Sequence, residues 1–261
     1  MFPISDEKDP NAHGPAIITL LIILANIAVF IFLQHTGHND AFTYAYSMVP
    51  HEVLSGHDVA QTVRLIDPVT GSSGGSINLQ PTPIPIWETI FTSMFMHGGF
   101  MHLFGNMLFL WIFGDNLEHA MGRFKFLCFY LICGTAAAAC QIGATVFSGA
   151  NDLIPMLGAS GAISGILGGY MVLFPTRRVN VLLWFFITAV PAWVCLGLWF
   201  VFQLISGMGI LGSATQVGGV AYAAHIGGFI SGLMLVRAFA NRGEAISNLR
   251  RYQHHRDSAR F

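Results

Sequence analysis

Runs of apolar residues with almost no charged side chains constrain this chain more than any other feature. A helix needs about 20 apolar residues to cross about 30 Å of hydrocarbon, and six runs reach or approach that length. They extend from about Pro15 to Leu33, Phe100 to Leu117, Phe124 to Phe147, Ser160 to Pro175, Val181 to Ile205 and Gly218 to Ala240. Only 10% of the residues are charged, against roughly 25% in soluble globular proteins. The sequence therefore predicts an all-α polytopic membrane protein, a bundle of six transmembrane helices.

Nearly all lysine and arginine residues lie at one set of junctions between these runs. They are Arg123 with Lys125, Arg177 with Arg178, and the tail from Arg237 through Arg260. Positively charged loops face the cytoplasm, whereas the segments after the first, third and fifth runs contain only Arg64. We therefore expect both termini to be cytoplasmic. The acidic N-terminus lacks the cationic start of a cleaved signal peptide, so the first run is interpreted as a retained span.

These assignments divide the chain into three parts. They are a cytoplasmic N-terminal segment, 1–14, a six-helix domain, 15–240, and a basic cytoplasmic tail, 241–261. Inside the domain a long external loop covers 34–89, with a Gly/Ser-rich and a Pro-rich stretch. Loops of this length are usually functional or disordered. A tolerated insertion and a role in handling a substrate both stay open.

Charge and cysteine patterns exclude several classes of function. The net charge is -1 and the body of the chain contains no basic stripe with interleaved aromatic residues, so nucleic acid is not expected as a partner. The four cysteines lie inside apolar runs without CxxC spacing, which favours small packing residues over a disulfide framework. We predict no metal site and no cofactor.

Polar side chains inside three of the runs are costly in lipid and therefore indicate function. The second run contains His102 and Asn106 at i,i+4 spacing, which places them on one helix face, and His97 lies just before it. The fourth run opens with GASGAISG, around Ser160, and the sixth contains AHIGGFISG, around His225. Taken singly, each of these residues is more often a structural hydrogen-bonding group. Their joint placement changes this interpretation.

Helix geometry puts the polar groups at similar depths. At a rise of about 1.5 Å per residue, Ser160 lies about 25 Å from the cytoplasmic end of its run, and His225 and Asn106 each lie about 18 Å from theirs. The fourth run would be only about 24 Å long, so its free N–H groups should lie below the outer surface. Small-residue stripes also let helix backbones approach closely. They are Gly161, Gly165 and Gly169 in the fourth run and Ala224, Gly228 and Gly232 in the sixth.

These positions suggest acyl-transfer chemistry. A serine hydroxyl becomes a good nucleophile when a neutral histidine takes its proton, and close packing of the two stripes would bring Ser160 within reach of His225. The last three runs contain no Asp or Glu in their apolar parts, so we infer a dyad instead of a triad. The side chains of His102 and Asn106 and the Ser160 backbone N–H are candidate oxyanion donors.

The same residues resemble the motifs of the rhomboid family of intramembrane proteases. The segment HGGFMHLFGNMLFLWIFGDNLEHAMGRF is similar to the family's second-helix signature, with His97, His102 and Asn106 in H-x4-H-x3-N spacing. GASGAISG resembles the G-x-S-G nucleophile motif, and AHIGGFISG resembles the histidine motif. The resemblance covers about Trp87 to Val236, in family order.

The resemblance implies a six-helix intramembrane serine endopeptidase that cuts single-span membrane proteins in or near their transmembrane segments. It implies Ser160 as nucleophile, His225 as base, and His102, Asn106 and the Ser160 amide as the oxyanion hole. Supporting roles are expected for His97, Gly158, Gly161, Ser164 and Gly228. Some members carry an aromatic residue where this chain has Ser164, so another contact, such as a hydrogen bond from Ser164, must orient His225. The expected location is a prokaryotic plasma membrane.

Other functions stay open at this stage. A catalytically inactive rhomboid-like protein would bind membrane helices without cutting them, and a small-solute transporter would also have six spans with buried polar groups. Intramembrane acidic residues or an internal repeat would favour the transporter. The runs contain no internal repeat, and Asp115, at the end of the second run, is their only acidic residue. A metal or haem protein could use His97, His102 and His225, but no HExxH motif occurs. The sequence does not define the oligomeric state or the physiological substrate.

Overall fold

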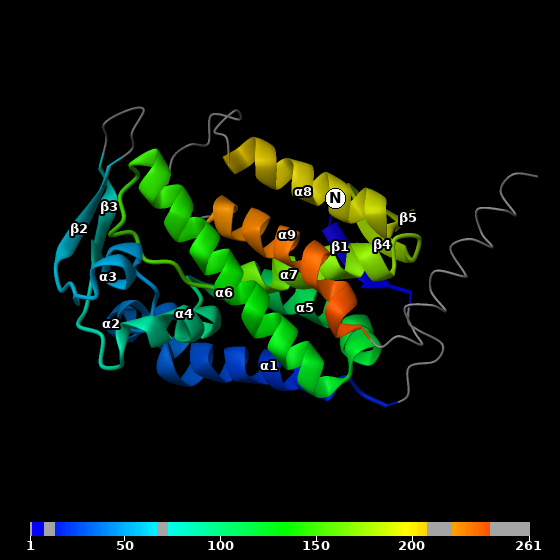
Figure 1. Ribbon diagram of the computed structural model, residues 1–261, viewed down its shortest axis with the longest axis horizontal. Helices are drawn as coiled ribbons and strands as arrows, with labels where there is room; N and C mark the ends of the chain where they lie inside the picture. The colour runs from blue at the N-terminus through cyan, green and yellow to red at the C-terminus, as the bar shows by residue number, and fades with distance from the viewer. Residues whose placement is uncertain (1, 8–13, 67–72, 208–220, 241–261) are drawn as a thin grey trace, which may run out of the picture.

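A computed structural model describes residues 2–7, 14–66, 73–207 and 221–240, and most of these residues are helical. The long helices are α1 (Ile17–Ala28), continued by the π-helical turn η1 (Val29–Leu33), α5 (Phe100–Met121), α6 (Arg123–Ser148), α7 (Ser160–Leu173), α8 (Ala192–Gly207) and α9 (Tyr222–Phe239). They form one bundle with α7 near its middle and a small sheet at each end (Figure 1). Every residue of α7 from Ala162 to Tyr170 is buried. The helix that begins at Ser160 is therefore the core of the bundle.

Five of the six predicted runs correspond to helices within a few residues, but the fifth does not. Its first half forms the strands β4 (Arg178–Leu183) and β5 (Phe186–Pro191), and α8 begins only at Ala192. The prediction of one helix from Val181 to Ile205 was therefore wrong over its first part. The run is rich in β-branched and aromatic residues, which favour strands, and hydrophobicity alone cannot separate a buried strand from a helix.

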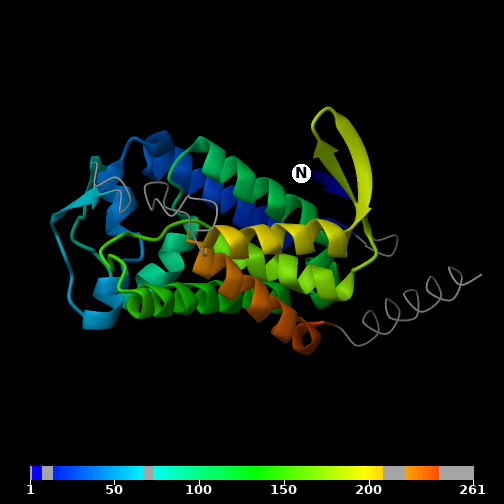
Figure 2. The same cartoon turned by 90° about the horizontal axis from the view of Figure 1, so that it is seen from above.

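The described residues are mostly helical, as predicted, with two small sheets beside the helices. The strand β1 (Phe2–Asp6) pairs antiparallel with β4, and β4 pairs with β5, which gives the sheet order β1-β4-β5. The start of the chain, predicted as a separate cytoplasmic segment, is therefore part of a sheet (Figure 2). The predicted basic tail, 241–261, lies outside the described residues.

Short elements fill the segment between α1 and α5. They are η2 (His35–Gly37), α2 (Asp40–Ala45), α3 (Pro50–Ser55), β2 (Thr62–Ile66), β3 (Ser73–Asn78), η3 (Ile86–Glu88), α4 (Thr89–Thr92) and η4 (Ser93–Phe95). The strands β2 and β3 pair antiparallel at the end of the bundle opposite β1. The predicted long loop, 34–89, is therefore an ordered insertion over its described residues.

The insertion holds the loop that leads into α7. The backbones of Met48 and Met156 exchange hydrogen bonds of 3.0 and 2.7 Å. The backbone N–H of His51 donates to the carbonyl oxygen of Asp152 at 3.0 Å, and His51 Nδ1 lies 2.9 Å from Asp152 Oδ2. These contacts fix residues that lie just before Ser160.

Large apolar side chains are exposed on the outside of the bundle. Examples from five different helices are Leu21, Trp111, Phe147, Phe202 and Met234. Among the described residues, α6 and α9 are long and apolar enough to cross a membrane, and the helical segment Ile17–Leu33, α7 and α8 are shorter apolar helices. An apolar exterior fits a lipid solvent, whereas the count of six spans stays a prediction.

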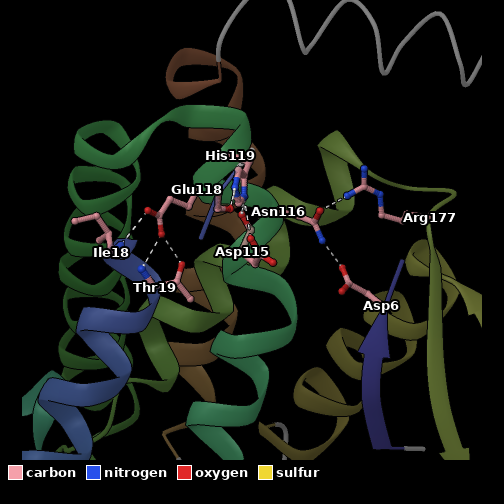
Figure 3. Close-up of polar contacts among 9 residues, drawn as sticks. Asp6, Ile18, Thr19, Asp115, Asn116, Glu118, His119 and Arg177 are labelled. Carbon is pink, nitrogen blue, oxygen red and sulfur yellow. Dashed lines mark hydrogen bonds and ion pairs between the residues drawn. The ribbon is translucent and has the colours of Figure 1, made fainter. Parts of the chain in front are cut away.

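Polar contacts tie the start of α1 to α5 at the β1 end (Figure 3). No side chain caps α1 at Ala16, and the first N–H groups of a helix have no partner within the helix. The carboxylate of Glu118, on α5, accepts from the backbone N–H groups of Ile18 and Thr19 at 2.9 and 2.7 Å, and from Thr19 Oγ1 at 2.8 Å. Glu118 is therefore a cap supplied from a neighbouring helix.

Asp6 connects β1 to two of the three helices that carry the polar motifs, α5 and α7. Its Oδ2 accepts from Asn116 Nδ2, on α5, at 2.5 Å and from the Tyr170 hydroxyl, on α7, at 2.6 Å. Arg177 donates to Asn116 Oδ1 (Figure 3). Burial raises the pKa of Asp6 to about 6, and the hydrogen bonds and the charge of Arg177 oppose this rise. The network joins β1, α5 and α7 at one end of the bundle.

Close backbone contact between α7 and α9 determines how the bundle packs. A Cβ atom added to Gly228 would lie less than 3.0 Å from the carbonyl oxygen of Gly161, and one on Gly232 would lie equally close to that of Gly165. The stripes of small residues therefore face each other, as the sequence predicted. No other pair of described elements packs more extensively.

Substitution of Gly228 tests this contact. We expect Gly228→Ala to lower the free energy of unfolding by about 1–3 kcal/mol, because a methyl group has no room against the Gly161 backbone. The matched control is Gly143→Ala on α6, where an added Cβ meets nothing within 4 Å, and which should be neutral or slightly stabilising. Denaturant unfolding of both variants in detergent measures the difference. Equal effects of the two substitutions would contradict the close packing.

Candidate active site

Ser160 and His225 lie next to each other where α7 and α9 pack. Ser160 is the first residue of α7, and His225 lies in the first turn of α9. The hydroxyl oxygen of Ser160 is 2.8 Å from His225 Nε2. The distance is that of a good hydrogen bond, so the two predicted residues form a directly bonded pair.

Gln203, on α8, determines which ring nitrogen of His225 carries the proton. His225 Nδ1 lies 2.8 Å from Gln203 Oε1. An amide oxygen can only accept a hydrogen bond, so Nδ1 carries the proton and Nε2 is free to accept from the Ser160 hydroxyl. Gln203 is buried, with 6% of its surface exposed, which fixes this contact within the protein.

Ser164 does not make the hydrogen bond to His225 that the sequence suggested. Its Oγ donates to the backbone carbonyl oxygen of Ser160, one turn earlier on α7, at 2.7 Å. This is the usual bond of a serine within a helix. The contact that orients His225 comes from Gln203 and, at a ring-centroid distance of 6.1 Å, from Trp199.

Asn106 and His97 form a second polar pair beside the first. Asn106 Nδ2 lies 3.0 Å from His97 Nε2. The side chain of Gln34 forms hydrogen bonds with both backbone groups of His97. Its Oε1 accepts from the His97 N–H at 3.0 Å, and its Nε2 donates to the His97 carbonyl oxygen at 2.9 Å. One N–H of the Asn106 amide is used by His97, so the other is available to the neighbouring cavity.

Gly158 lets His102 approach the loop before Ser160. Its φ angle is +119°, in the left-handed region that favours glycine. A Cβ at this position would lie 2.8 Å from the imidazole of His102. The Gly158 N–H donates to the carbonyl oxygen of Ser93 at 2.8 Å. Any larger residue would therefore push His102 away from the loop before Ser160.

These groups line one cavity of about 760 Å³. Ser160, His225, His102 and Asn106 all contribute to its surface, and Ser164 lies there as well. Further walls come from α5, α8 and the insertion, through Met101, Phe109, Trp199, Gln203, Tyr44, Leu65 and Ser76. The volume is within the usual range of ligand sites. Gly161 and Gly228 do not line the cavity and contact each other where α7 and α9 meet.

The three histidines considered as metal ligands are placed differently. The rings of His97 and His102 have centroids 5.1 Å apart, while His225 bonds Ser160 and Gln203. Within the described ranges, no group of three His, Cys, Asp or Glu side chains is arranged to hold a metal ion.

Two glutamines in the predicted membrane runs were not predicted as site residues. Gln203 bonds His225, and Gln141 Oε1, on α6, accepts from the backbone N–H of Ala224 at 3.2 Å. Both lie in predicted membrane runs, where polar residues indicate function. Applying that rule to glutamine as well as to His, Ser and Asn would have found them.

Together these features define a helical protein with an apolar exterior and a serine–histidine pair in an open cavity. Comparison with known proteins agrees with this class. A family model described as the Rhomboid domain matches residues 85–242. Because the match covers more than half of the chain, the chain belongs to the rhomboid family.

Relatives come from several kinds of organism. The mitochondrial rhomboid protein 1 of Saccharomyces cerevisiae is 34% identical over 146 residues, which are 56% of this chain and 40% of the yeast protein. The putative rhomboid protease YdcA of Bacillus subtilis is 34% identical over 116 residues, 44% of this chain and 53% of its own length. RHOMBOID-like protein 1 of Arabidopsis thaliana is 27% identical over 232 residues, 85% of this chain and 52% of its own length.

The chain thus matches about half, or less, of the length of these relatives. The family is integral to membranes, which fits the apolar exterior. Since mitochondrial and plant proteins occur among the relatives, the comparisons give no support to a prokaryotic plasma membrane in particular.

Replacing Gln203 tests the role of its hydrogen bond. We expect Gln203→Ala to slow the reaction of Ser160 with a fluorophosphonate about tenfold, since a bond of about 1–1.5 kcal/mol would no longer hold the imidazole. The measurement is the rate of labelling at fixed reagent concentration, with the melting temperature recorded on the same sample. Leu198→Ala, on the exposed face of the same helix, is the control and should label normally. An unchanged rate for Gln203→Ala would show that Gln203 does not orient His225.

Proposed function

We propose that this chain is an intramembrane serine endopeptidase of the rhomboid type, which hydrolyses peptide bonds in or near the transmembrane segments of membrane proteins. The observation that carries the proposal is the 2.8 Å hydrogen bond between Ser160 and His225 inside a cavity. Membership of the rhomboid family supports it, and several relatives are named as proteases. Single-span membrane proteins are the proposed substrates.

The proposed mechanism begins with Ser160. Its Oγ attacks the carbonyl carbon of the scissile bond while its proton moves to His225 Nε2, and Gln203 holds the proton on Nδ1. The C–N bond then breaks, and the imidazolium gives its proton to the leaving amine. His225 next takes a proton from water, which attacks the carbonyl carbon of the ester on Ser160. The ester C–O bond then breaks, and the imidazolium returns the proton to Ser160 Oγ as the new carboxyl group leaves.

Three donors are proposed for the developing oxyanion. They are the Ser160 backbone N–H, the side chain of His102 and the free N–H of the Asn106 amide. The first N–H groups of α7 have no partner within the helix, and donors of this kind act most strongly where water is excluded. The contact between His97 and Asn106 is proposed to position the amide.

Six transmembrane spans with both termini on the cytoplasmic side remain the proposed topology. The shared positions of the positive residues support it. The active-site cavity would then open toward the opposite side of the membrane, where water can reach Ser160. Proposed partners are the lipid bilayer and the substrate helix.

The experiment compares purified wild-type protein with two single variants and their combination. Ser160→Ala and His225→Ala should each abolish cleavage of a single-span peptide in detergent, without a change in melting temperature. The double variant should be no worse than either single variant, because a nucleophile and its base act as one unit. Cleavage fragments are measured by mass spectrometry.

Full activity in either single variant would contradict the dyad. A folded wild-type protein that binds single-span peptides but never cuts them would instead favour a catalytically inactive relative. EDTA should leave cleavage intact, whereas a loss that zinc restores would favour a metalloprotein.

A further inference from the structure

The hairpin of β2 and β3 forms part of the wall of the active-site cavity. Gly75, Ser76 and Ile77, three consecutive residues of β3, line the cavity that also contains Ser160 and His225. Successive side chains of a strand point to opposite faces. Leu65 of β2, which pairs with Gly75, also lines the cavity. The cavity therefore meets one face of the hairpin and, at Ser76, whose side chain points to the other face, extends around the free edge of β3.

This edge has no strand beside it among the described residues. The strands β2 and β3 pair only with each other. An unpaired edge presents N–H and C=O groups that can bind another chain, and a two-stranded sheet gains stability from a third strand. Gly75 and Ser76 are small and exposed at this edge, so another backbone can come close.

The hairpin is also fixed relative to the loop before Ser160. Val63, on β2, and Leu79, just after β3, are 6% and 2% exposed and form a small core with Val49. Ile77 and Leu153 pack against this core. Leu153 belongs to the loop that leads into α7, so the edge of β3 and the nucleophile are held by the same part of the protein.

We propose that the edge of β3 docks the substrate, by binding an extended segment next to the scissile bond as a third strand. This inference rests on the proposed function and adds a binding site to it. A substrate segment must leave its helix before a peptide bond can reach Ser160, and its freed backbone groups then need new partners. Main-chain hydrogen bonds to a sheet edge provide them with little demand on side-chain identity.

Cysteine crosslinking tests the docking edge directly. The probe is a synthetic single-span peptide that the wild-type enzyme cleaves, with one cysteine moved residue by residue through its extended flank. The enzyme carries Ser76→Cys and Ser160→Ala in a background with its four native cysteines replaced by alanine. We expect one flank position, the one directly opposite Ser76, to form the disulfide. Its two neighbours point to the other face, and positions two residues away lie about 7 Å along the strand, which is too far.

The matched control is Arg64→Cys, directly opposite Ser76 on β2. A substrate strand beside β3 would lie two strand spacings, or about 10 Å, from position 64, which is too far for a disulfide. Crosslinks at Arg64→Cys instead, at both positions equally, or at neither would overturn the proposal.

A second measurement uses the unmodified enzyme and so does not depend on how the cysteine variants fold. Single N-methylation of the flank amides should raise KM about tenfold at alternate positions, where a backbone hydrogen bond is lost. A uniform or absent effect on a peptide that is still cleaved would contradict the docking edge alone. Failure to cleave any single-span peptide would contradict the proposed function itself.

Discussion

The direct contact between the backbones of α7 and α9 is the interaction on which the rest of the structure depends. It requires glycine at positions such as Gly228 and Gly232, because a Cβ there would overlap the carbonyl groups of Gly161 and Gly165. Only at this separation can the Ser160 hydroxyl reach the imidazole of His225. In a membrane, helices gain little from hydrophobic burial against each other, so shape and close packing must supply the association. The site geometry is therefore a consequence of small residues.

Two other parts of the chain support this contact from its ends. At one end the insertion between α1 and α5 holds the loop before Ser160, through the backbone bridge of Met48 and Met156. At the other end Asp6 bonds residues of both α5 and α7, so the N-terminal strand joins helices that are far apart in sequence. Both ends of α7 are thus restrained by segments outside the predicted helical runs.

The sequence predicted the parts of the structure that follow from periodicity and local motifs. Five helices and the two small-residue stripes could be located because apolar length and glycine spacing have direct physical meanings. The β4–β5 hairpin could not, because the run from Val181 to Ile205 is apolar throughout and its fold depends on pairing with β1. The β-branched and aromatic residues of the run favour strands, but the partner strand comes from the other end of the chain and leaves no signal in the run itself.

In the candidate site, too, residues within local motifs were predicted and residues that depend on the three-dimensional fold were not. Ser160, His225 and Asn106 were predicted from motifs and spacing. Gln203 was missed, because it lies on α8 in a run without a recognisable motif, and its role depends on the three-dimensional approach of α8 to α9. Ser164 was expected to bond His225, but its hydroxyl donates to a backbone carbonyl oxygen of its own helix, as serine in a helix often does.

Capture of an acyl-enzyme intermediate tests the central claim of this account most directly. Wild-type protein is mixed with a single-span substrate, quenched with acid within one turnover, digested and examined by mass spectrometry. The account predicts an ester between the N-terminal substrate fragment and the hydroxyl of Ser160, and no such ester in His225→Ala. Cleavage that proceeds with no adduct on Ser160, or with an adduct on another residue, would contradict it.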